Sequence, residues 1–324
     1  MCTAITLQTK DFYFGRTLDL DESYSEEVTI TPRKFSFSFG NGKKLENHYA
    51  MIGMAHVLED YPLYFDAVNE KGLAMAGLNF DMPDNYAQER AGMEPVAVFE
   101  LIPWVLAQCS GVAEANTLLK KTSLTDQAFR EDLPPTGLHW ILADQYEAVT
   151  VEPAPDGLRI FENKPGVLTN NPSFDCQMLR LNDYLNLSPG IPENRFCPDL
   201  ELQAYSAGMG ALGLPGDVSS QSRFVRGAFT KLNSVCSMEE GESVGQFFHI
   251  LGSVEQVRGC CRMEDGKWEM TLYTSCCNTD KGIYYYTTYG NRQITGVNMH
   301  RERLDDSFLI RYPLISAEQI RMQN

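Results

Sequence analysis

The second residue of the chain is a cysteine, a position with distinctive chemistry. Removal of Met1, which a small second residue permits, would leave a thiol and a free α-amine on one residue. The ordinary pKa is ~8.5 for a thiol and ~7.7–8.0 for an α-amine, so the amine is a base close to neutral pH. Nucleophile and general base would then share one Cα, and no catalytic histidine would be required. Cys2 therefore predicts thiol hydrolase chemistry, although a Met-Cys start also fits an ordinary N-terminus.

The other possible nucleophiles and metal ligands lack the spacing of a site. The chain has nine cysteines, an odd number, and no C-x-x-C pair, so neither a disulfide framework nor a zinc site is expected. The five histidines are not paired at metal or catalytic spacing, and His139 and His249 lie in apolar segments, as core or partly exposed histidines do. Residues 208–213 match G-x-G-x-x-G, but Pro215 prevents a helix from following them. We expect no metal and no organic cofactor.

The segments that must position Cys2 form blocks of strands and blocks of helices. The expected strands cover residues 3–7, 12–16, 28–31, 35–39, 64–68, 73–78, 138–143, 148–152, 158–161, 268–275, 283–289 and 294–299. The expected helices cover residues 95–106, 112–121, 174–185, 220–232 and 244–252. In the first of these, Pro95 suits a helix start, and Pro103 predicts a kink or an early end. This order indicates an α+β protein rather than alternating βαβ units, in one domain over residues 1–324.

Composition and charge exclude several partners. The chain has 27 Lys+Arg and 43 Asp+Glu, a net charge of −16, and no basic cluster, so nucleic acid is not expected as a partner. No stretch approaches ~18 consecutive apolar residues, so membrane insertion is not expected. The N-terminus lacks a basic region followed by an apolar one, as a secretory signal would have. These features predict a soluble, cytoplasmic protein.

A series of short motifs strengthens the prediction that Cys2 is a nucleophile. It starts with Cys-Thr-Ala-Ile-Thr at residues 2–6 and Phe-Gly-Arg-Thr-Leu-Asp at residues 14–19. The later motifs are Asp-Tyr-Pro-Leu-Tyr-Phe-Asp-Ala at 60–67, Ala-Gly-Leu-Asn-Phe at 76–80, Leu-Thr-Asn-Asn-Pro at 168–172, Gly-Leu-Pro-Gly-Asp at 213–217, Ser-Arg-Phe at 222–224 and Tyr-Tyr-Tyr-Thr-Thr-Tyr at 284–289. In this order, over nearly the whole chain, they resemble the choloylglycine hydrolase family of bile salt hydrolases and penicillin V acylases. The bile salt hydrolase branch is favoured, because Asn79 stands where acylases that prefer penicillin V often carry tyrosine.

The resemblance implies a four-layer αββα sandwich, the fold of the N-terminal nucleophile hydrolases. The family's nucleophile falls on Cys2. Its arginine falls on Arg16, whose charge would favour the thiolate. Its aspartate falls on Asp19, which would hydrogen-bond the α-amine and orient it. Thr17 stands where asparagine is common in the family, and we expect its side chain to point away from Arg16 and Asp19.

The resemblance also implies donors for the oxyanion that forms when an amide is attacked. They fall on Asn79 and on Asn170, with Asn171 as the alternative to Asn170. A second family arginine falls on Arg223, with Arg226 as the alternative. The implied reaction is a two-step acyl transfer through a thioester, with no cofactor.

The substrate implied by the resemblance is a glycine- or taurine-conjugated bile acid, whose amide bond would be cleaved. Because a steroid needs an apolar trough, Leu20, Met54, Phe65 and Leu133 are candidates for its lining. Penicillin V or N-acyl-homoserine-lactone acylase activity at the same site, and a non-catalytic bile-acid-binding protein, remain alternatives. The resemblance further implies a homotetramer, assembled with the help of residues 188–205.

Overall fold

The computed structural model describes residues 1–81 and 90–324, and two antiparallel sheets form its centre. In the first sheet the strand order is β14–β1–β2–β16–β17–β18, and β15 pairs with β16 outside this order. Its strands are β1 (Cys2–Gln8), β2 (Phe12–Leu20), β14 (Val167–Leu168), β15 (Cys261–Arg262), β16 (Trp268–Asn278), β17 (Ile283–Thr288) and β18 (Asn291–Asn298). The N-terminal hairpin β1–β2 is thus enclosed between β14 and β16.

The second sheet has the order β13–β12–β11–β8–β7–β6–β3–β19. Its strands are β3 (Glu27–Thr31), β6 (Met51–Leu58), β7 (Tyr61–Asn69), β8 (Ala74–Asn79), β11 (Leu138–Ala143), β12 (Ala148–Ala154), β13 (Gly157–Glu162) and β19 (Ile310–Pro313). Two small pairs lie outside both sheets: β4 (Phe37–Ser38) with β5 (Lys44–Leu45), and β9 (Glu94–Ala97) with β10 (Thr122–Thr125).

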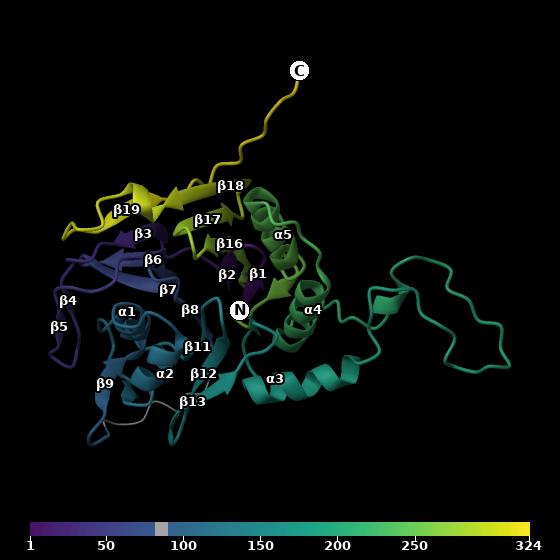
Figure 1. Cartoon of the computed structure of the whole chain (residues 1–324), viewed down its shortest axis with the longest axis horizontal. Coiled ribbons are helices and arrows are strands. Elements are labelled where there is room, and N and C mark those ends of the chain that lie inside the picture. The colour runs from purple at the N-terminus through teal and green to yellow at the C-terminus, as the bar shows by residue number, and fades with distance from the viewer. Residues whose placement is uncertain (82–89) are drawn as a thin grey trace.

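Helices cover the outer face of each sheet, so the molecule has four layers (Figure 1). On the first sheet, α4 (Ser220–Asn233) packs against β1 and β14, and α5 (Glu240–Gly252) against β16. On the second, α1 (Leu101–Leu106) packs against β7 and β8 and is joined by α2 (Val112–Leu119), while α3 (Phe174–Arg180) packs beside α4. The short 3-10 helices are η1 (Val98–Glu100), η2 (Leu181–Tyr184), η3 (Met209–Ala211) and η4 (Met299–Arg301). Figure 1 shows the N-terminus in the middle of the molecule.

Two apolar clusters hold the layers together. One contains Phe14 and Tyr273 of the first sheet together with Phe247 of α5, and it continues to the facing side of the second sheet. The other joins the second sheet to α1 and includes Trp104 and Trp140, both fully buried. Burying each such side chain contributes about 1.5–3 kcal/mol, so the strands that carry the N-terminus are held firmly between layers.

The sequence predicted most elements and misassigned a few. Pro95 does not begin a helix but lies in β9, where it pairs in parallel with Ser123 of β10. The helix begins at Leu101 and is six residues long, with Pro103 in its first turn, where the missing N–H costs no helical bond. The expected strand at residues 35–39 is reduced to β4, and several strands were not expected, among them β6 and β19. Most of these errors concern short strands, but β6 is a central strand of eight residues.

Candidate active site

The strand β2 presents different chemistry on its two faces. Successive side chains of a strand point to opposite faces, so Arg16 and Leu18 share one face and Thr17 and Asp19 the other. Arg16 and Leu18 line a cavity together with Cys2, which lies opposite Leu18 in the β1–β2 register. We call this the cavity face of the first sheet, and the face covered by α4 and α5 its helix face. The hairpin therefore separates the predicted nucleophile from the predicted aspartate by one sheet thickness.

Arg16 is fully buried on the cavity face and fixed by main-chain acceptors. Its guanidinium donates to the carbonyl oxygens of Thr17 at 3.1 Å and Phe65 at 3.1 Å, and also to that of Gly77. Burial by itself lowers the pKa of Arg16, but the Cys2 thiol and nearby acids raise it above its ordinary value overall. Arg16 is thus a permanent positive charge beside Cys2.

Asp19 is fully buried on the helix face and is surrounded by neutral donors. Its carboxylate accepts hydrogen bonds from Thr271 Oγ1 at 2.7 Å, Thr17 Oγ1 at 3.2 Å and Gln256 Nε2 at 3.3 Å. The expectation that the Thr17 side chain points away from Asp19 is wrong, because residues two apart in a strand share a face. Thr17 Oγ1 also accepts from the Thr3 N–H at 3.1 Å, so it links β1 to the carboxylate.

Asn170 and Arg223 hold the main chain of Cys2. The Cys2 nitrogen donates to Asn170 Oδ1 at 2.9 Å, and Arg223 Nη2 donates to the same oxygen at 2.7 Å. Arg223 Nη1 donates to the Cys2 carbonyl oxygen and, at 2.8 Å, to Thr3 Oγ1. Burial lowers the pKa of Arg223, and the charges of Asp19 and Cys2 oppose this shift. We expected Asp19 to bind this nitrogen; with Met1 attached, its hydrogen-bond partner is Asn170.

The two alternative residues bind elsewhere. Asn171 exchanges two hydrogen bonds with the main chain of Asp81, at 2.9 and 3.1 Å. Arg226 donates to the carbonyl oxygens of Ser253 at 2.6 Å and Pro215 at 2.7 Å. The geometry therefore favours the first choice at both positions.

Asn79 brings the second sheet into the site. It ends β8, its side chain is exposed, and it lines the cavity that Cys2 also lines. Its main-chain oxygen accepts from Asn170 Nδ2 at 2.7 Å, so one of the two N–H bonds of that amide is occupied. The structure thus brings all six predicted catalytic residues into one connected region: Cys2, Arg16, Asp19, Asn79, Asn170 and Arg223.

The cavity in front of Cys2 has a volume of about 530 Å³. Of the predicted lining residues, Leu20, Phe65 and Leu133 line it, whereas Met54 does not. Met54 is completely covered in the core between the sheets, so its side chain does not reach the cavity. The sequence did not identify further lining residues, among them Tyr24, His56, Phe99, Phe129 and Pro134. Most of them come from loops and edges whose approach depends on the tertiary fold.

Met1 lies in the cavity, next to an acidic residue that the sequence did not reveal. Its amine donates to the carbonyl oxygen of Asp19 at 2.7 Å and forms an ion pair with Glu269. Burial lowers the pKa of the Met1 amine from its ordinary value. With Met1 attached, the nitrogen of Cys2 is an amide, which cannot accept a proton near neutral pH.

Within residues 1–81 and 90–324, no group of three or more His, Cys, Asp or Glu side chains is arranged to hold a metal ion. In the same part of the chain, every helix is too short or too polar to cross a membrane.

Comparison with known proteins places this geometry in a family. A model of the linear amide C–N hydrolases, choloylglycine hydrolase family, matches residues 2–312. The chain is 52% identical over 319 residues to a bile salt hydrolase/transferase of Lactiplantibacillus plantarum, covering 98% of both chains. It is 39% identical to a bile salt hydrolase/transferase of Clostridium perfringens, covering 96% of both.

Solved structures agree. A mutant of conjugated bile acid hydrolase from Clostridium perfringens superposes over 100% of both chains with a TM-score of 0.92 and 37% identity. Penicillin V acylase from Agrobacterium tumefaciens, with a TM-score of 0.75, 19% identity and coverage of 96% of this chain and 91% of its own, shares the fold. The α+β, four-layer fold expected from the sequence is thereby confirmed. The chain belongs to the choloylglycine hydrolase family and is a hydrolase of linear amide C–N bonds.

Proposed function

We propose that this enzyme cleaves the amide bond of glycine- and taurine-conjugated bile acids. The observation that carries the proposal is the position of Cys2, which opens into an apolar cavity of about 530 Å³ beside the buried charge of Arg16. A cavity of this volume and character suits a steroid acyl group. Relatives named bile salt hydrolase/transferase, 52% and 39% identical, support this choice of substrate.

The reaction begins after removal of Met1, when the α-amine of Cys2 is a free base. The amine takes the proton of the thiol, and the thiolate attacks the carbonyl carbon of the substrate. The C–N bond then breaks, and the protonated amine gives its proton to the departing amino acid. Water attacks the thioester, the amine accepts its proton, and the bile acid leaves as the thiolate is regained.

Each remaining residue has a role set by its contacts. Asn79, with its side chain facing the cavity, donates to the oxyanion, which a positioned donor stabilises in the transition state. Asn170 Oδ1 orients the Cys2 amine and holds Arg223. With Met1 absent, the freed amine gains hydrogens that the amide lacks, and Asp19 is the nearby carboxylate that stabilises its protonated form.

A direct comparison of substrates tests this proposal. Glycocholate, taurocholate, penicillin V and an N-acyl-homoserine lactone are assayed with the same enzyme, and release of glycine or taurine is measured. Hydrolysis of both conjugates well above the other two amides supports the proposal. Faster hydrolysis of penicillin V or of the lactone would favour the acylase alternative. If no amino acid is released, and the protein binds conjugated bile acids equally well before and after alkylation of Cys2, it is a binding protein.

Acyl transfer to an amine is a second candidate activity. The thioester is attacked by water in hydrolysis, and an amine in the same place would give a new amide. The word transferase in the names of two relatives favours this reading. Incubation of glycocholate with an excess of a second amino acid should yield the exchanged conjugate, detected by mass spectrometry.

We further propose a single-domain, cytoplasmic homotetramer. Residues 185–208 leave the body of the molecule as a long irregular excursion (Figure 1). This segment exposes Leu185, Ile191, Phe196 and Tyr205, which a neighbouring subunit would cover. Light scattering of the protein in solution tests the tetramer, and cell fractionation tests the location.

A further inference from the structure

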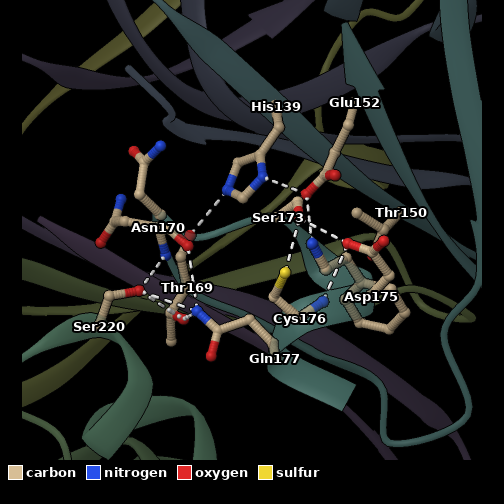
Figure 2. Close-up of polar contacts among 12 residues, drawn as sticks. His139, Thr150, Glu152, Thr169, Asn170, Ser173, Asp175, Cys176, Gln177 and Ser220 are labelled. Carbon is tan, nitrogen blue, oxygen red and sulfur yellow. Dashed lines mark hydrogen bonds and ion pairs between the residues drawn. The ribbon is translucent and has the colours of Figure 1, made fainter. Parts of the chain in front are cut away.

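A buried histidine outside the predicted catalytic set lies beside the loop that carries Asn170 (Figure 2). His139 belongs to β11 and is fully buried. Its Nε2 lies 2.8 Å from the carbonyl oxygen of Thr169, and its Nδ1 lies 3.1 Å from Glu152 Oε1. Phe80 stacks on its ring with centroids 4.4 Å apart and an interplanar angle of 11°. The ring is therefore fixed at both nitrogens and on one face.

The partners of His139 determine which nitrogens carry hydrogen. A carbonyl oxygen only accepts, so Nε2 must donate to Thr169. A proton also lies between Nδ1 and the Glu152 carboxylate, because otherwise two lone pairs would face each other. Whichever of the two atoms holds that proton, the hydrogen bond to Thr169 stays the same.

Two contacts of the His139 ring, those with Thr169 and Phe80, lead to the predicted oxyanion donors. Thr169 directly precedes Asn170, whose Oδ1 accepts from the Cys2 nitrogen. Phe80 directly follows Asn79, and β11 pairs with β8 so that His139 lies opposite the residue before Asn79. One imidazole thus connects the segment on the second sheet with the loop that follows β14.

Glu152 is itself fixed, so it can orient the ring. It is buried on β12, and the same Oε1 accepts from the N–H of Phe174, the first residue of α3, at 2.9 Å. Figure 2 shows a second set of bonds beyond Thr169, in which Ser220 and Gln177 hold the loop. The loop of Asn170 is therefore supported by polar contacts from two sides.

We propose that His139, oriented by Glu152, is a positioning residue that fixes Asn79 and Asn170 relative to Cys2. The proposal rests on the function proposed above, since it assigns a purpose to the alignment of these asparagines. Displacement of a reacting group by about 1 Å can cost up to about 100-fold in rate, which is the scale of effect expected.

Two substitutions by uncharged amides each keep one of the two hydrogen bonds of the ring and remove the other. The amide nitrogen of glutamine is as many bonds from Cα as Nε2 of histidine, so His139→Gln keeps a donor for Thr169 and loses the bond to Glu152. The amide nitrogen of asparagine matches Nδ1, so His139→Asn keeps the bond to Glu152 and loses the one to Thr169. Both remove the ring that stacks on Phe80, so comparison of the two weighs the contact with Thr169 against the contact with Glu152.

His48 offers a matched control away from the cavity. Like those of His139, both nitrogens of His48 contact oxygen atoms. These are the carbonyl oxygens of Tyr49 and Phe35, each at 2.8 Å, and His48 is half-buried. His48→Asn and His48→Gln therefore report what these exchanges do to stability alone. Thermal unfolding of all four variants is measured beside kcat and KM for glycocholate.

We expect His139→Asn to lower kcat by about 10- to 100-fold with little change in KM, and His139→Gln to lower kcat by less than about 10-fold. The His48 variants should unfold at lower temperature with unchanged kcat. Equal kcat for the two His139 variants would overturn the proposal, as would an effect confined to KM. If the wild type hydrolyses another linear amide instead of glycocholate, the proposed function fails. The ratio of kcat between His139→Gln and His139→Asn, measured on that amide, then still decides the role of His139.

Discussion

The cavity face and the helix face of the first sheet divide the work of the site. On the cavity face, Cys2 and Arg16 border the space for the substrate. On the helix face, Asp19 and Arg223 are completely covered, and their partners are side chains and main-chain atoms of the protein. A change on the cavity face should therefore affect the reaction directly, whereas a change on the helix face should act through the position of the N-terminus and through stability.

The largest effect should follow loss of the nucleophile on the cavity face. Cys2→Ala should lower kcat by on the order of 10⁶-fold, because no other group forms the thioester. Its thermal unfolding should be unchanged, since one small side chain is lost. Cys176→Ala is the control, because this exposed thiol lies on α3. Inactivation by iodoacetamide that follows modification of Cys176, with Cys2 unmodified, would contradict the assignment.

Retention of Met1 should be nearly as severe without changing any side chain. Enzyme made with methionine aminopeptidase inhibited should be inactive, because Met1 lies in the cavity and Cys2 has an amide in place of its base. Subsequent removal of Met1 by added aminopeptidase should restore activity, with intact mass as the check. Full activity of a preparation in which every chain retains Met1 would contradict the N-terminal nucleophile mechanism.

Asn79 tests the opposite wall of the cavity. Asn79→Ala should lower kcat by about 10²–10³-fold, the loss expected for one oxyanion donor, and it leaves the main-chain acceptor for Asn170 in place. Asn171→Ala is the matched control, since among the described residues this amide exchanges its hydrogen bonds with the main chain of Asp81. A change in KM alone would mean that Asn79 binds the substrate without stabilising the transition state.

The sequence placed the residues of the N-terminal hairpin together but did not reveal the partners of Asp19. Cys2, Arg16 and Asp19 lie in one hairpin, so local motifs could place them together. Thr17 was misread although the strand period of two already places its side chain on the same face as that of Asp19. The other partners of Asp19 come from the far end of the chain, and no local pattern links them to it.

The fold shows the same limit. Long segments such as α4 and β16 were predictable from their periodicity, whereas the central strand β6 was missed. Pro95 and Met54 were not predictable, because a parallel pairing with Ser123 decides the first and complete covering in the core decides the second. The link from His139 to Asn170 likewise exists only once β11 and the loop after β14 are brought together.

A moderate effect should follow a change on the helix face next to Asp19. Thr17→Val removes a donor to Asp19 and the acceptor of the Thr3 N–H, while it keeps the shape of the side chain. The unpaired buried N–H should cost about 1–3 kcal/mol in the free energy of unfolding, measured in urea. We expect kcat to fall by about 10-fold, as Asp19 loses part of its orientation. Thr17→Ser keeps the hydroxyl and should restore both quantities; if it behaves as Thr17→Val does, the hydroxyl is not responsible.

The smallest effect should come from Lys231, a half-buried cation on the helix that carries Arg223. Its Nζ donates to Thr6 Oγ1 at 2.9 Å and to the carbonyl oxygen of Pro165, away from the cavity. Burial lowers the pKa of Lys231 from 10.5 to about 8. Between these two pH values the unfolded chain binds more protons than the folded one at this site, so this group makes stability rise with pH from about 8 to 10.5.

Lys231→Met should remove that contribution and leave kcat unchanged. Other groups titrate in the same range, so the quantity to measure is the difference between wild type and variant in thermal midpoint, followed from pH 8 upward. The difference should shift steadily in favour of the wild type as pH rises, because only the wild type sheds the cost of burying a charged amine. Lys120→Met, at the exposed lysine that follows the last residue of α2, should show no such trend. If both variants show the same trend, Lys231 is not its cause. If kcat falls for Lys231→Met alone, Lys231 supports the reaction, and the helix face has no part that serves stability without serving the reaction.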